Sequence, residues 1–493
     1  MSNYLLAIDQ GTTSSRAVIF DTDLHVIATH QITFPQSFPH DGWVEHHPED
    51  LWNTTYDCLK AVLQQANLAP HQIAGLGISN QRETTLLWDR ATGETLYPAI
   101  VWQDRRTAQF CHTLAQDPAL VQSIQFKTGL LIDPYFSATK LAWLLDNVPH
   151  ARERACKGEL AFGTVDTFLL WRLTKGRVHA TDASNASRTL LFNIRTQTWD
   201  EELLKLFNIP AALLPAVLDC AHHFGETDAA LLGSPIPITG IAGDQQCALI
   251  GQACFEPGLI KSTYGTGCFM ILNTGKDIIQ SKHRLLSTVA YRLNNEVTYG
   301  LEGSIFVAGA AVQWLRDAMH LIAHATDTAS LCESVPNTGG VYLVPAFTGL
   351  GAPYWDPEAR GALLGLTRDT QVPHIVRAAM EAVCYQSRDL LEAMREDGAH
   401  LTCLRVDGGM TANSWLLTFL ANMLDITVER PLNGETSVLG AAFLAGLGSG
   451  IFASLEILAK QWRAHSSYTP TMPSHERTAL YSGWQRAVRR VIA

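Results

Sequence analysis

One pattern occurs twice in this sequence and limits the folds open to it: an apolar strand, a short polar turn and a second apolar strand. The first copy covers residues 4–20 and turns at Asp9–Arg16. The second covers residues 258–272 and turns at Tyr264–Gly267. Each turn holds Gly and Thr between two apolar runs, a pattern typical of a hairpin. The repetition predicts two related domains, the second of which starts near residue 251.

The length of the chain agrees with two domains. At 493 residues it exceeds the size of one ordinary hydrophobic core, so we predict domains at residues 1–250 and 251–493. Helix 48–66 and strand 73–79 follow the first pattern, and strands and helices go on alternating, which predicts an α/β fold. The charge-free stretch Val438–Leu455 contains four glycines, which favours a buried, closely packed helix and turn over a membrane span.

Composition and charge exclude several classes of protein. Apolar residues make up 47% of the chain and charged residues 17%, as in a globular protein. The formal net charge of -11 argues against nucleic acid or an anionic membrane as a partner. The ten cysteines form no Cys-x-x-Cys pair, and the N-terminus lacks the basic segment and long apolar run of a signal peptide. We therefore expect reduced thiols and a cytoplasmic protein.

The first turn has the chemistry of a phosphate site, although the sequence contains neither a P-loop nor a Gly-x-Gly-x-x-Gly dinucleotide motif. Gly11 lets the backbone approach a phosphate group. The hydroxyl, amide and guanidinium donors of the turn belong to Thr12, Thr13, Ser14 and Arg16. Asp9 ends the first strand and could hold Mg²⁺ through its water shell. A polar hairpin without a ligand is the alternative for this turn taken alone.

Two later segments of the sequence also have residues that suit a nucleotide. Thr266 lies in the second turn, and a third element, Val406–Asn413, reads Asp-Gly-Gly between an apolar strand and a helix. Glycines there permit close approach of a flat ligand, and the helix N-terminus suits a phosphate. Asp-Gly is also a common turn, so this element is weak evidence alone.

The three elements, in this order, are similar to those of the actin, hexokinase and heat-shock chaperone ATPase superfamily. Tyr135–Asn147 resembles one signature of the FGGY carbohydrate kinases, and Gly361–Leu366 with His374–Glu381 resembles the other. The resemblance extends from about Tyr4 to Trp484. It implies two ribonuclease H-like domains flanking a central cleft for nucleotide and substrate, in a homodimer or homotetramer.

Within that family the chain most resembles the members that phosphorylate glycerol. The motifs that carry this similarity are Asn80–Thr85, Gly163–Thr167, Asn185–Thr189, Gly243–Gln246 and Phe347–Pro357. The resemblance implies phosphoryl transfer from Mg²⁺-ATP to glycerol, giving sn-glycerol 3-phosphate in glycerol uptake and catabolism. Two alternatives stay open: another polyol or sugar kinase of the family, and a non-catalytic module that ATP drives between conformations.

A pocket for glycerol needs fixed donors beside fixed acceptors, because each hydroxyl both donates and accepts. By resemblance Arg82 and Glu83 supply both, and Tyr135, Asp244 and Gln245 bind further hydroxyls. The side chains implied to cover the carbon chain are Trp102 and Phe269. Taken singly, each has an ordinary structural explanation, such as core packing for an aromatic ring or a solvated strand end for an Arg-Glu pair.

Asp244 is the predicted general base, since it follows the apolar strand 236–242 at the junction of the predicted domains. It is also a possible Mg²⁺ ligand, and a helix-capping Asp is its structural alternative. By resemblance the phosphates of ATP are bound by Thr12, Thr13, Ser14, Arg16 and Thr266. By the same resemblance the nucleoside is bound by Gly309, Gln313, Gly409 and Asn413.

Two regulatory contacts of some relatives are altered in this sequence. Their fructose 1,6-bisphosphate loop contains Arg and is Gly-rich, whereas the matching stretch 227–235 is shorter and has no Arg. A carboxylate that shares zinc with a phosphotransferase carrier protein is replaced by Pro473, with His475 and Glu476 nearby. We expect both kinds of regulation to be weak or absent.

Overall fold

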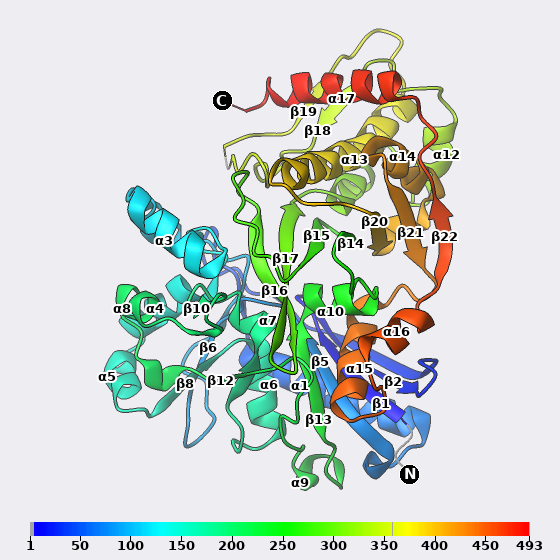
Figure 1. The fold of residues 1–493 in the computed structure, drawn as a ribbon. Coiled ribbons are helices and arrows are strands. Elements are labelled where there is room, and N and C mark those ends of the chain that lie inside the picture. The colour runs from blue at the N-terminus through cyan, green and yellow to red at the C-terminus, as the bar shows by residue number, and fades with distance from the viewer. Residues whose placement is uncertain (1–3, 357, 493) are drawn as a thin grey trace. The chain divides into compact units, whose positions relative to one another are not determined.

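The structure is a computed structural model, and it describes residues 4–356 and 358–492 (Figure 1). The chain forms two compact units, each built from several stretches. Unit 1 comprises Met1–Ala253, Ser287–Tyr299 and Thr436–Gln461. Unit 2 comprises Cys254–Leu286, Gly300–Glu435 and Trp462–Ala493. The chain passes between the units more than once, so neither unit is a single stretch of sequence.

Unit 1 is centred on a five-stranded sheet with the order β13-β5-β1-β2-β3. Its strands are β1 (Tyr4–Gln10), β2 (Ser14–Asp21), β3 (Val26–Thr33), β5 (Ile73–Asn80) and β13 (Ile238–Gly243). The first three strands pair antiparallel, and β5 and β13 run parallel to β1. The predicted turn Asp9–Arg16 is too long, because Ser14 already pairs with β3, and Ser15 and Arg16 pair with both β1 and β3.

Helix α1 (Pro48–Ala66) packs against β2 and β3. Proline is favoured in the first turn of a helix, and Asn67 ends this one in the left-handed conformation. Its apolar stripe, which includes Leu51, Leu59 and Val62, is fully buried in the core of unit 1. The helix predicted over 48–66 is confirmed, since local signals fix both of its ends.

Helix α15 (Thr436–Gly448) also packs on the sheet of unit 1, although it comes from the C-terminal part of the chain (orange in Figure 1). It lies against β1, β5, β13 and helix α10 (Asp244–Gly251). A Cβ atom on Gly440 would lie 1.8 Å from the carbonyl oxygen of Cys247, so the two backbones approach closely. The buried, glycine-rich helix expected for this segment is confirmed.

Smaller elements of unit 1 surround this sheet. Its other helices are α2 (Ala108–Leu114), α3 (Pro118–Thr128), α4 (Ser137–Asn147), α5 (Ala151–Cys156), α6 (Val165–Leu173), α7 (Ala183–Ala186), α8 (Glu201–Leu206), α9 (Ala229–Leu232) and α16 (Leu455–Gln461). Four strand pairs are β4 (Glu45–His46) with β7 (Ala99–Ile100), β6 (Leu86–Asp89) with β8 (Leu160–Gly163), β9 (Ala180–Asp182) with β12 (Ala216–Leu218), and β10 (Phe192–Asn193) with β11 (Thr198–Trp199).

A seven-stranded sheet has the order β16-β17-β15-β14-β20-β21-β22. Its strands are β14 (Leu259–Tyr264), β15 (Cys268–Gly275), β16 (Leu286–Leu293), β17 (Glu296–Ile305), β20 (Cys403–Asp407), β21 (Thr427–Pro431) and β22 (Ala464–Tyr468). Strand β14 pairs antiparallel with β15 and parallel with β20, as β1 does with β2 and β5. The repeat and the α/β class predicted from the sequence are therefore confirmed.

Helices of unit 2 bury apolar side chains in the same core as strands of the seven-stranded sheet. They are α11 (Gly309–Gln313), α12 (Asp327–Glu333), α13 (Val372–Glu396), α14 (Ser414–Leu424) and α17 (Ser474–Val488), with a π-helical turn, η3, at Trp314–Ala318. A short pair, β18 (Tyr342–Val344) and β19 (Ala362–Leu364), packs near α13. Among the described residues, every helix is either too short or too polar to cross a bilayer.

Candidate functional site

The candidate substrate site of unit 1 lies where three strands end together. Gln10, the last residue of β1, is in register with Asn80 of β5, and Asn80 is in register with Gly243 of β13. Since these strands are parallel, the segments that follow them emerge at one edge of the sheet, which is where α/β folds bind ligands. Those segments contain the polar turn after β1, the Arg82-Glu83 pair after β5, and Asp244 after β13.

Arg82 lies between two carboxylates at this edge. Its Nε is 3.8 Å from Oε1 of Glu83 and 3.5 Å from Oδ1 of Asp244. It also donates from Nη1 to Oε1 of Gln246 and from Nη2 to the hydroxyl of Tyr135, both at 3.3 Å. The side chains of Arg82 and Glu83 are 2% and 1% exposed, whereas that of Asp244 is 27% exposed. Asp244 is therefore the more exposed of the two carboxylates in this cluster.

Glu83 is held by groups that come from distant parts of the chain. Arg188 donates from Nε to Oε1 of Glu83 at 2.7 Å, and both side chains are buried. Ser137 donates to the Glu83 carbonyl at 3.0 Å. The backbone of Glu83 is left-handed, with φ 59°, a conformation that costs a non-glycine residue about 1–3 kcal/mol. This strained residue lies in the candidate site, where the contacts from Arg188 and Ser137 hold it in place.

Arg188 and Gln246 were not assigned roles from the sequence, although both lie inside motifs that carry the resemblance. Arg188 and Glu83 are 105 residues apart, and Arg82 and Gln246 are 164 apart. No local spacing connects residues so far apart, so the only signal available was their membership of the motifs. The fold brings these segments together through α7, α10 and the sheet.

The loop that presents Tyr135 is fastened by a buried lysine. Lys140 of α4 is fully buried and donates to the carbonyl oxygens of Pro134, Tyr135 and Phe136 at 2.9, 2.6 and 3.0 Å. Burial lowers the pKa of Lys140 to about 8, while the nearby carboxylate of Glu83 acts in the opposite direction. The three carbonyl dipoles compensate the ammonium group and fix the backbone on which Tyr135 stands.

The polar turn after β1 is short and well connected. The Gly11 N–H donates to the Ser14 carbonyl at 2.9 Å, which closes the turn. The Thr12 hydroxyl accepts from Nε1 of Trp102 at 3.0 Å, and the exposed Thr13 lies beside it. The Ser14 hydroxyl accepts from Gln31 of β3 at 2.9 Å. The turn therefore presents hydroxyl and amide groups at the same sheet edge as Arg82.

Two of the predicted phosphate and metal residues stand on strands. Arg16 is on β2, in register with Asp9 of β1, and its guanidinium donates twice to Oε1 of Gln31, at 3.1 and 2.8 Å. Oδ1 of Asp9 accepts from the Ser79 hydroxyl at 2.8 Å. Asp9 is partly buried, and both it and Asp244 raise the pKa of the buried Cys247 thiol after the larger effect of burial. Asp9 and Asp244 therefore both lie close enough to Cys247 to affect its thiol.

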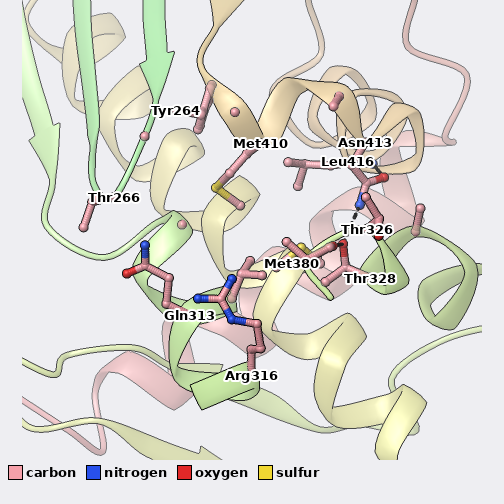
Figure 2. A pocket seen from close by; sticks show the side chains of 17 residues that line it. Tyr264, Thr266, Gln313, Arg316, Thr326, Thr328, Met380, Met410, Asn413 and Leu416 are labelled. Atoms are coloured by element: carbon pink, nitrogen blue, oxygen red, sulfur yellow. Dashed lines mark hydrogen bonds between the residues drawn. The ribbon is translucent and has the colours of Figure 1, made fainter. Parts of the chain in front are cut away.

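Unit 2 contains a separate cavity of about 340 Å³, in the range typical of small-molecule sites. Five predicted nucleotide residues line it: Thr266, Gly309, Gln313, Gly409 and Asn413. Other lining residues that sequence reasoning missed include Arg316, Thr326, Thr328, Met380, Met410 and Leu416. In the view of Figure 2, Thr266 and Asn413 lie on opposite sides of the pocket, with Gln313 and Met380 between them.

Asn413 joins two walls of this cavity. Its Oδ1 accepts from the Leu416 N–H at 3.1 Å and caps α14, while its Nδ2 donates to the Thr328 hydroxyl of α12 at 3.2 Å (Figure 2). The preceding Gly408 has φ +92°, and a Cβ there would lie 2.5 Å from the Tyr264 carbonyl oxygen. Only glycine fits such a position, which explains the first glycine of the Asp-Gly-Gly turn between β20 and α14.

The predicted glycerol residues do not all belong to one unit. Arg82, Glu83, Tyr135 and Asp244 form the contacts described above in unit 1, where Trp102 and the mostly buried Gln245 also lie. Phe269 lies on β15 of unit 2, and its carbonyl accepts from the buried Lys261 at 3.1 Å. Phe269 belongs to a different unit from the other predicted glycerol residues, and no local spacing in the sequence links it to them.

Comparisons with known proteins agree along the whole chain. The FGGY family of carbohydrate kinases matches by its N-terminal domain over residues 4–251 and by its C-terminal domain over residues 260–449. A glycerol kinase of Coxiella burnetii is 60% identical over 492 residues, which are 100% of this chain and 98% of the relative. Glycerol kinase 1 of Pseudomonas aeruginosa is 60% identical over 491 residues, 100% of this chain and 99% of the relative.

Solved structures give the same grouping. The crystal structure of Plasmodium falciparum glycerol kinase with ADP has a TM-score of 0.94 at 36% identity and covers 100% of this chain and 99% of its own. Gluconate kinase from Lactobacillus acidophilus has a TM-score of 0.87 at 22% identity, covering 97% and 95%, a similarity of fold alone. With both family domains matched in order and relatives aligned from end to end, the chain belongs to the FGGY family of carbohydrate kinases.

Proposed function

We propose that this protein transfers the γ-phosphoryl group of ATP to a terminal hydroxyl of glycerol, giving sn-glycerol 3-phosphate and ADP. The observation that carries the proposal is the position of Arg82 between the Glu83 and Asp244 carboxylates at the carboxyl edge of the sheet. This cluster offers donors and acceptors side by side, as a triol requires. Relatives of 60% identity that span the whole chain are named glycerol kinases, which supports the same substrate.

In this proposal Asp244 accepts the proton of the attacking hydroxyl. As that oxygen bonds to the γ-phosphorus, the bond from phosphorus to the β–γ bridging oxygen breaks, and ADP leaves with the electron pair. The transition state of phosphoryl transfer is loose, so positioning and charge neutralisation supply most of the acceleration. Asp244 suits the task because it is partly exposed while Arg82, buried beside it, fixes its orientation.

The other groups of unit 1 orient the triol. Arg82 donates to a hydroxyl oxygen, Glu83 accepts from a hydroxyl proton, and the Tyr135 hydroxyl can do either. The rings of Trp102 and Tyr135 form a T-shaped pair with centroids 5.7 Å apart, which gives the carbon chain an apolar surface. Gln245 and, from unit 2, Phe269 complete the proposed substrate residues.

The nucleotide is assigned to residues of both units. Thr12, Thr13, Ser14, Arg16 and Thr266 are proposed for the phosphates, and the unit 2 cavity with Gly309, Gln313, Gly409 and Asn413 for the nucleoside. The carboxylates of Asp9 and Asp244 are the hard oxygen donors that Mg²⁺ prefers, so these residues fit the ion. When bound, the ion would neutralise charge on the phosphates.

Two other functions remain testable alternatives. Another sugar or polyol kinase would share this fold, since xylulose and gluconate kinases do so at 22% identity. A non-catalytic ATP-driven module would not need the Arg82, Glu83 and Asp244 cluster. Measurement of ADP release with and without glycerol, with the product identified by a stereospecific sn-glycerol 3-phosphate dehydrogenase, separates the three. Turnover that ignores glycerol, or a product that the dehydrogenase rejects, would contradict the proposal.

We further propose that fructose 1,6-bisphosphate does not inhibit through the loop at 227–235. Two cations reach this loop from elsewhere: Arg177 and Lys175 lie 2.7 and 3.4 Å from the Asp228 carboxylate. Arg177 is the main cause that lowers the pKa of Asp228 to about 2, so the carboxylate stays ionised and occupies these cations. Bisphosphate-dependent inhibition that disappears when residues 227–235 are replaced would contradict this.

Regulation by a phosphotransferase carrier protein is proposed to be weak or absent. The position of the zinc-sharing carboxylate is taken by Pro473, the N-cap residue of α17, and proline offers no metal ligand. A zinc-dependent pull-down of the carrier would contradict the proposal.

We also propose that the protein forms a homodimer or homotetramer, as the resemblance to the family implies. Light scattering of the purified protein tests this, and a monomer would contradict it.

A further inference from the structure

Trp102 contacts two sets of residues in unit 1: the turn proposed for the phosphates and the residues proposed for glycerol. Its indole Nε1 donates to the Thr12 hydroxyl of the phosphate turn at 3.0 Å. Its ring packs edge-on against Tyr135 of the glycerol cluster. Its backbone N–H donates to the Thr84 hydroxyl at 3.3 Å, directly after the Arg82-Glu83 pair. One side chain therefore links the surface for the triol with the turn for the phosphates.

The indole contact determines what the Thr12 hydroxyl can do. A hydroxyl has one proton and two lone pairs, and here one lone pair accepts from the indole. Within residues 4–356 and 358–492, that indole is the hydrogen-bond partner of the Thr12 side chain, which is partly exposed. Its proton is thus left to donate outward, and a hydroxyl that already accepts a hydrogen bond is a stronger donor. An oxyanion such as a phosphate oxygen is the acceptor that fits.

Gln81 closes the contacts into a ring. It is 1% exposed, and its Nε2 donates to the Gly11 carbonyl at 3.0 Å and to Oε1 of Gln10 at 3.1 Å. Its Oε1 accepts from the Thr84 hydroxyl at 2.8 Å. The ring runs from Gln81 through Gly11 and Thr12 to Trp102, then through Thr84 back to Gln81. Such a closed network, buried at Gln81 and Thr84, holds the turn and the indole in one arrangement.

We infer that Trp102 is a positioning residue for the phosphate turn, and that its indole N–H couples glycerol binding to nucleotide binding. Glycerol on the Trp102 ring would hold the indole in place and keep the Thr12 hydroxyl directed at the phosphates. The inference rests on the proposed function, and it adds a role for Trp102 on the nucleotide side of the reaction. A side chain that only covers the carbon chain of glycerol would have no effect there.

Trp102→Phe tests this, because it keeps an aromatic face for glycerol and removes the indole N–H. We expect KM for Mg²⁺-ATP to rise about fivefold, as for the loss of one hydrogen bond, with KM for glycerol changed less than about twofold. Calorimetric affinity for Mg²⁺-ADP should weaken by a similar factor. Trp199→Phe is the matched control: its indole donates to the Pro215 carbonyl at 2.9 Å, outside the candidate site, and its loss should change neither constant.

A double-mutant cycle decides whether the effect passes through Thr12. In a Thr12→Val background, Trp102→Phe should have no further effect on the nucleotide constants, while Thr12→Ser, which keeps the hydroxyl, should retain the full effect. An unchanged KM for Mg²⁺-ATP in Trp102→Phe, or an equal change with and without the Thr12 hydroxyl, overturns the inference. Wild-type protein without glycerol-dependent turnover would instead overturn the proposed function.

Discussion

At the scale of single residues, Arg82 connects the candidate glycerol site. It reaches Glu83 beside it, Tyr135, and both Asp244 and Gln246 of α10, which come from three segments of unit 1. Because its guanidinium is 2% exposed, a ligand hydroxyl that displaced one of these partners would enter a largely desolvated position. Hydrogen bonds formed there are stronger than in water.

Arg82→Ala should therefore weaken glycerol binding more than the chemical step. Loss of a charged hydrogen-bond donor costs about 1.5–3 kcal/mol, which predicts a rise in KM for glycerol of about 10- to 100-fold. Steady-state kinetics at saturating ATP measure this. Lys60→Ala is the control, since it removes an exposed cation of α1 that pairs only with Asp57 among the described carboxylates. An unchanged KM for glycerol in Arg82→Ala would show that Arg82 does not bind glycerol.

Asp244→Asn separates binding from chemistry. The amide keeps the size and the hydrogen-bonding capacity of the side chain, but it cannot take a proton. We expect kcat to fall by about 100- to 10,000-fold, the usual contribution of a general base, while glycerol remains bound detectably. Equilibrium binding of glycerol and single-turnover kinetics check the two parts. A kcat near that of the wild type would show that another group accepts the proton.

At this scale, sequence motifs identified Arg82, Glu83 and Asp244, and the structure brings these three together. They did not reveal the Arg188–Glu83 ion pair or the Trp102–Thr12 hydrogen bond, whose members are 105 and 90 residues apart. Such contacts depend on tertiary folding, and nothing in local spacing encodes them. A single sequence therefore gives candidate residues but not the hydrogen-bond network among them.

Among the elements, α15 depends on glycine for its close contact with α10. In Gly440→Ala the new Cβ would lie 1.8 Å from the Cys247 carbonyl oxygen, so backbone has to move. We expect the free energy of unfolding to fall by about 1–3 kcal/mol, measured by urea denaturation. Gly434→Ala is the matched control, because nothing lies within 4 Å of its added Cβ. Equal stabilities of the two variants would contradict the described packing.

The contact between α13 and α17 should make stability depend on pH. Asp389 of α13 is buried and accepts from the Tyr481 hydroxyl at 2.6 Å and from Nε1 of Trp484 at 2.8 Å. Burial raises the pKa of Asp389 from 3.8 to about 7, and these two hydrogen bonds oppose the rise. A raised pKa in the folded state means that its stabilising contribution is complete below about pH 4 and is lost as the pH rises to about 7.

Asp389→Asn removes this titration. The free energy of unfolding of the wild type should therefore fall, relative to that of the variant, between pH 4 and pH 7, and the difference should be constant above that range. A pKa shift of this size corresponds to a change of a few kcal/mol in the free energy of unfolding. Urea denaturation of both proteins across this range measures it. Parallel pH profiles of the two proteins would show that Asp389 titrates normally.

The elements also show where sequence patterns suffice. The bounds of α1 were predicted correctly because proline at its start and the apolar period act locally. The start of β2 was predicted three residues late, because Ser14, Ser15 and Arg16 are polar and become strand only by pairing with β1 and β3. Strand ends depend on partners, and a polar residue on a strand looks like a turn in sequence.

At the scale of the whole molecule, the internal repeat was the most informative feature. It predicted two related domains, and the five-stranded and seven-stranded sheets share the arrangement of an antiparallel hairpin with two further parallel strands. Which segments make up each unit was not predictable, since α15 packs on the sheet of unit 1 although it begins 193 residues after β13 ends (436 − 243). Such packing depends on shape complementarity, such as that of Gly440 with α10, which no periodicity reveals.

For the whole molecule, we propose that the cluster of Arg82, Glu83 and Asp244 selects glycerol as the acceptor of a phosphoryl group. The most direct test is kcat/KM for glycerol, erythritol, xylulose and gluconate under identical ATP and Mg²⁺ concentrations. We expect kcat/KM to be highest for glycerol and this preference to be lost in Arg82→Ala. A higher kcat/KM for xylulose or gluconate would contradict it and assign the same fold to another sugar.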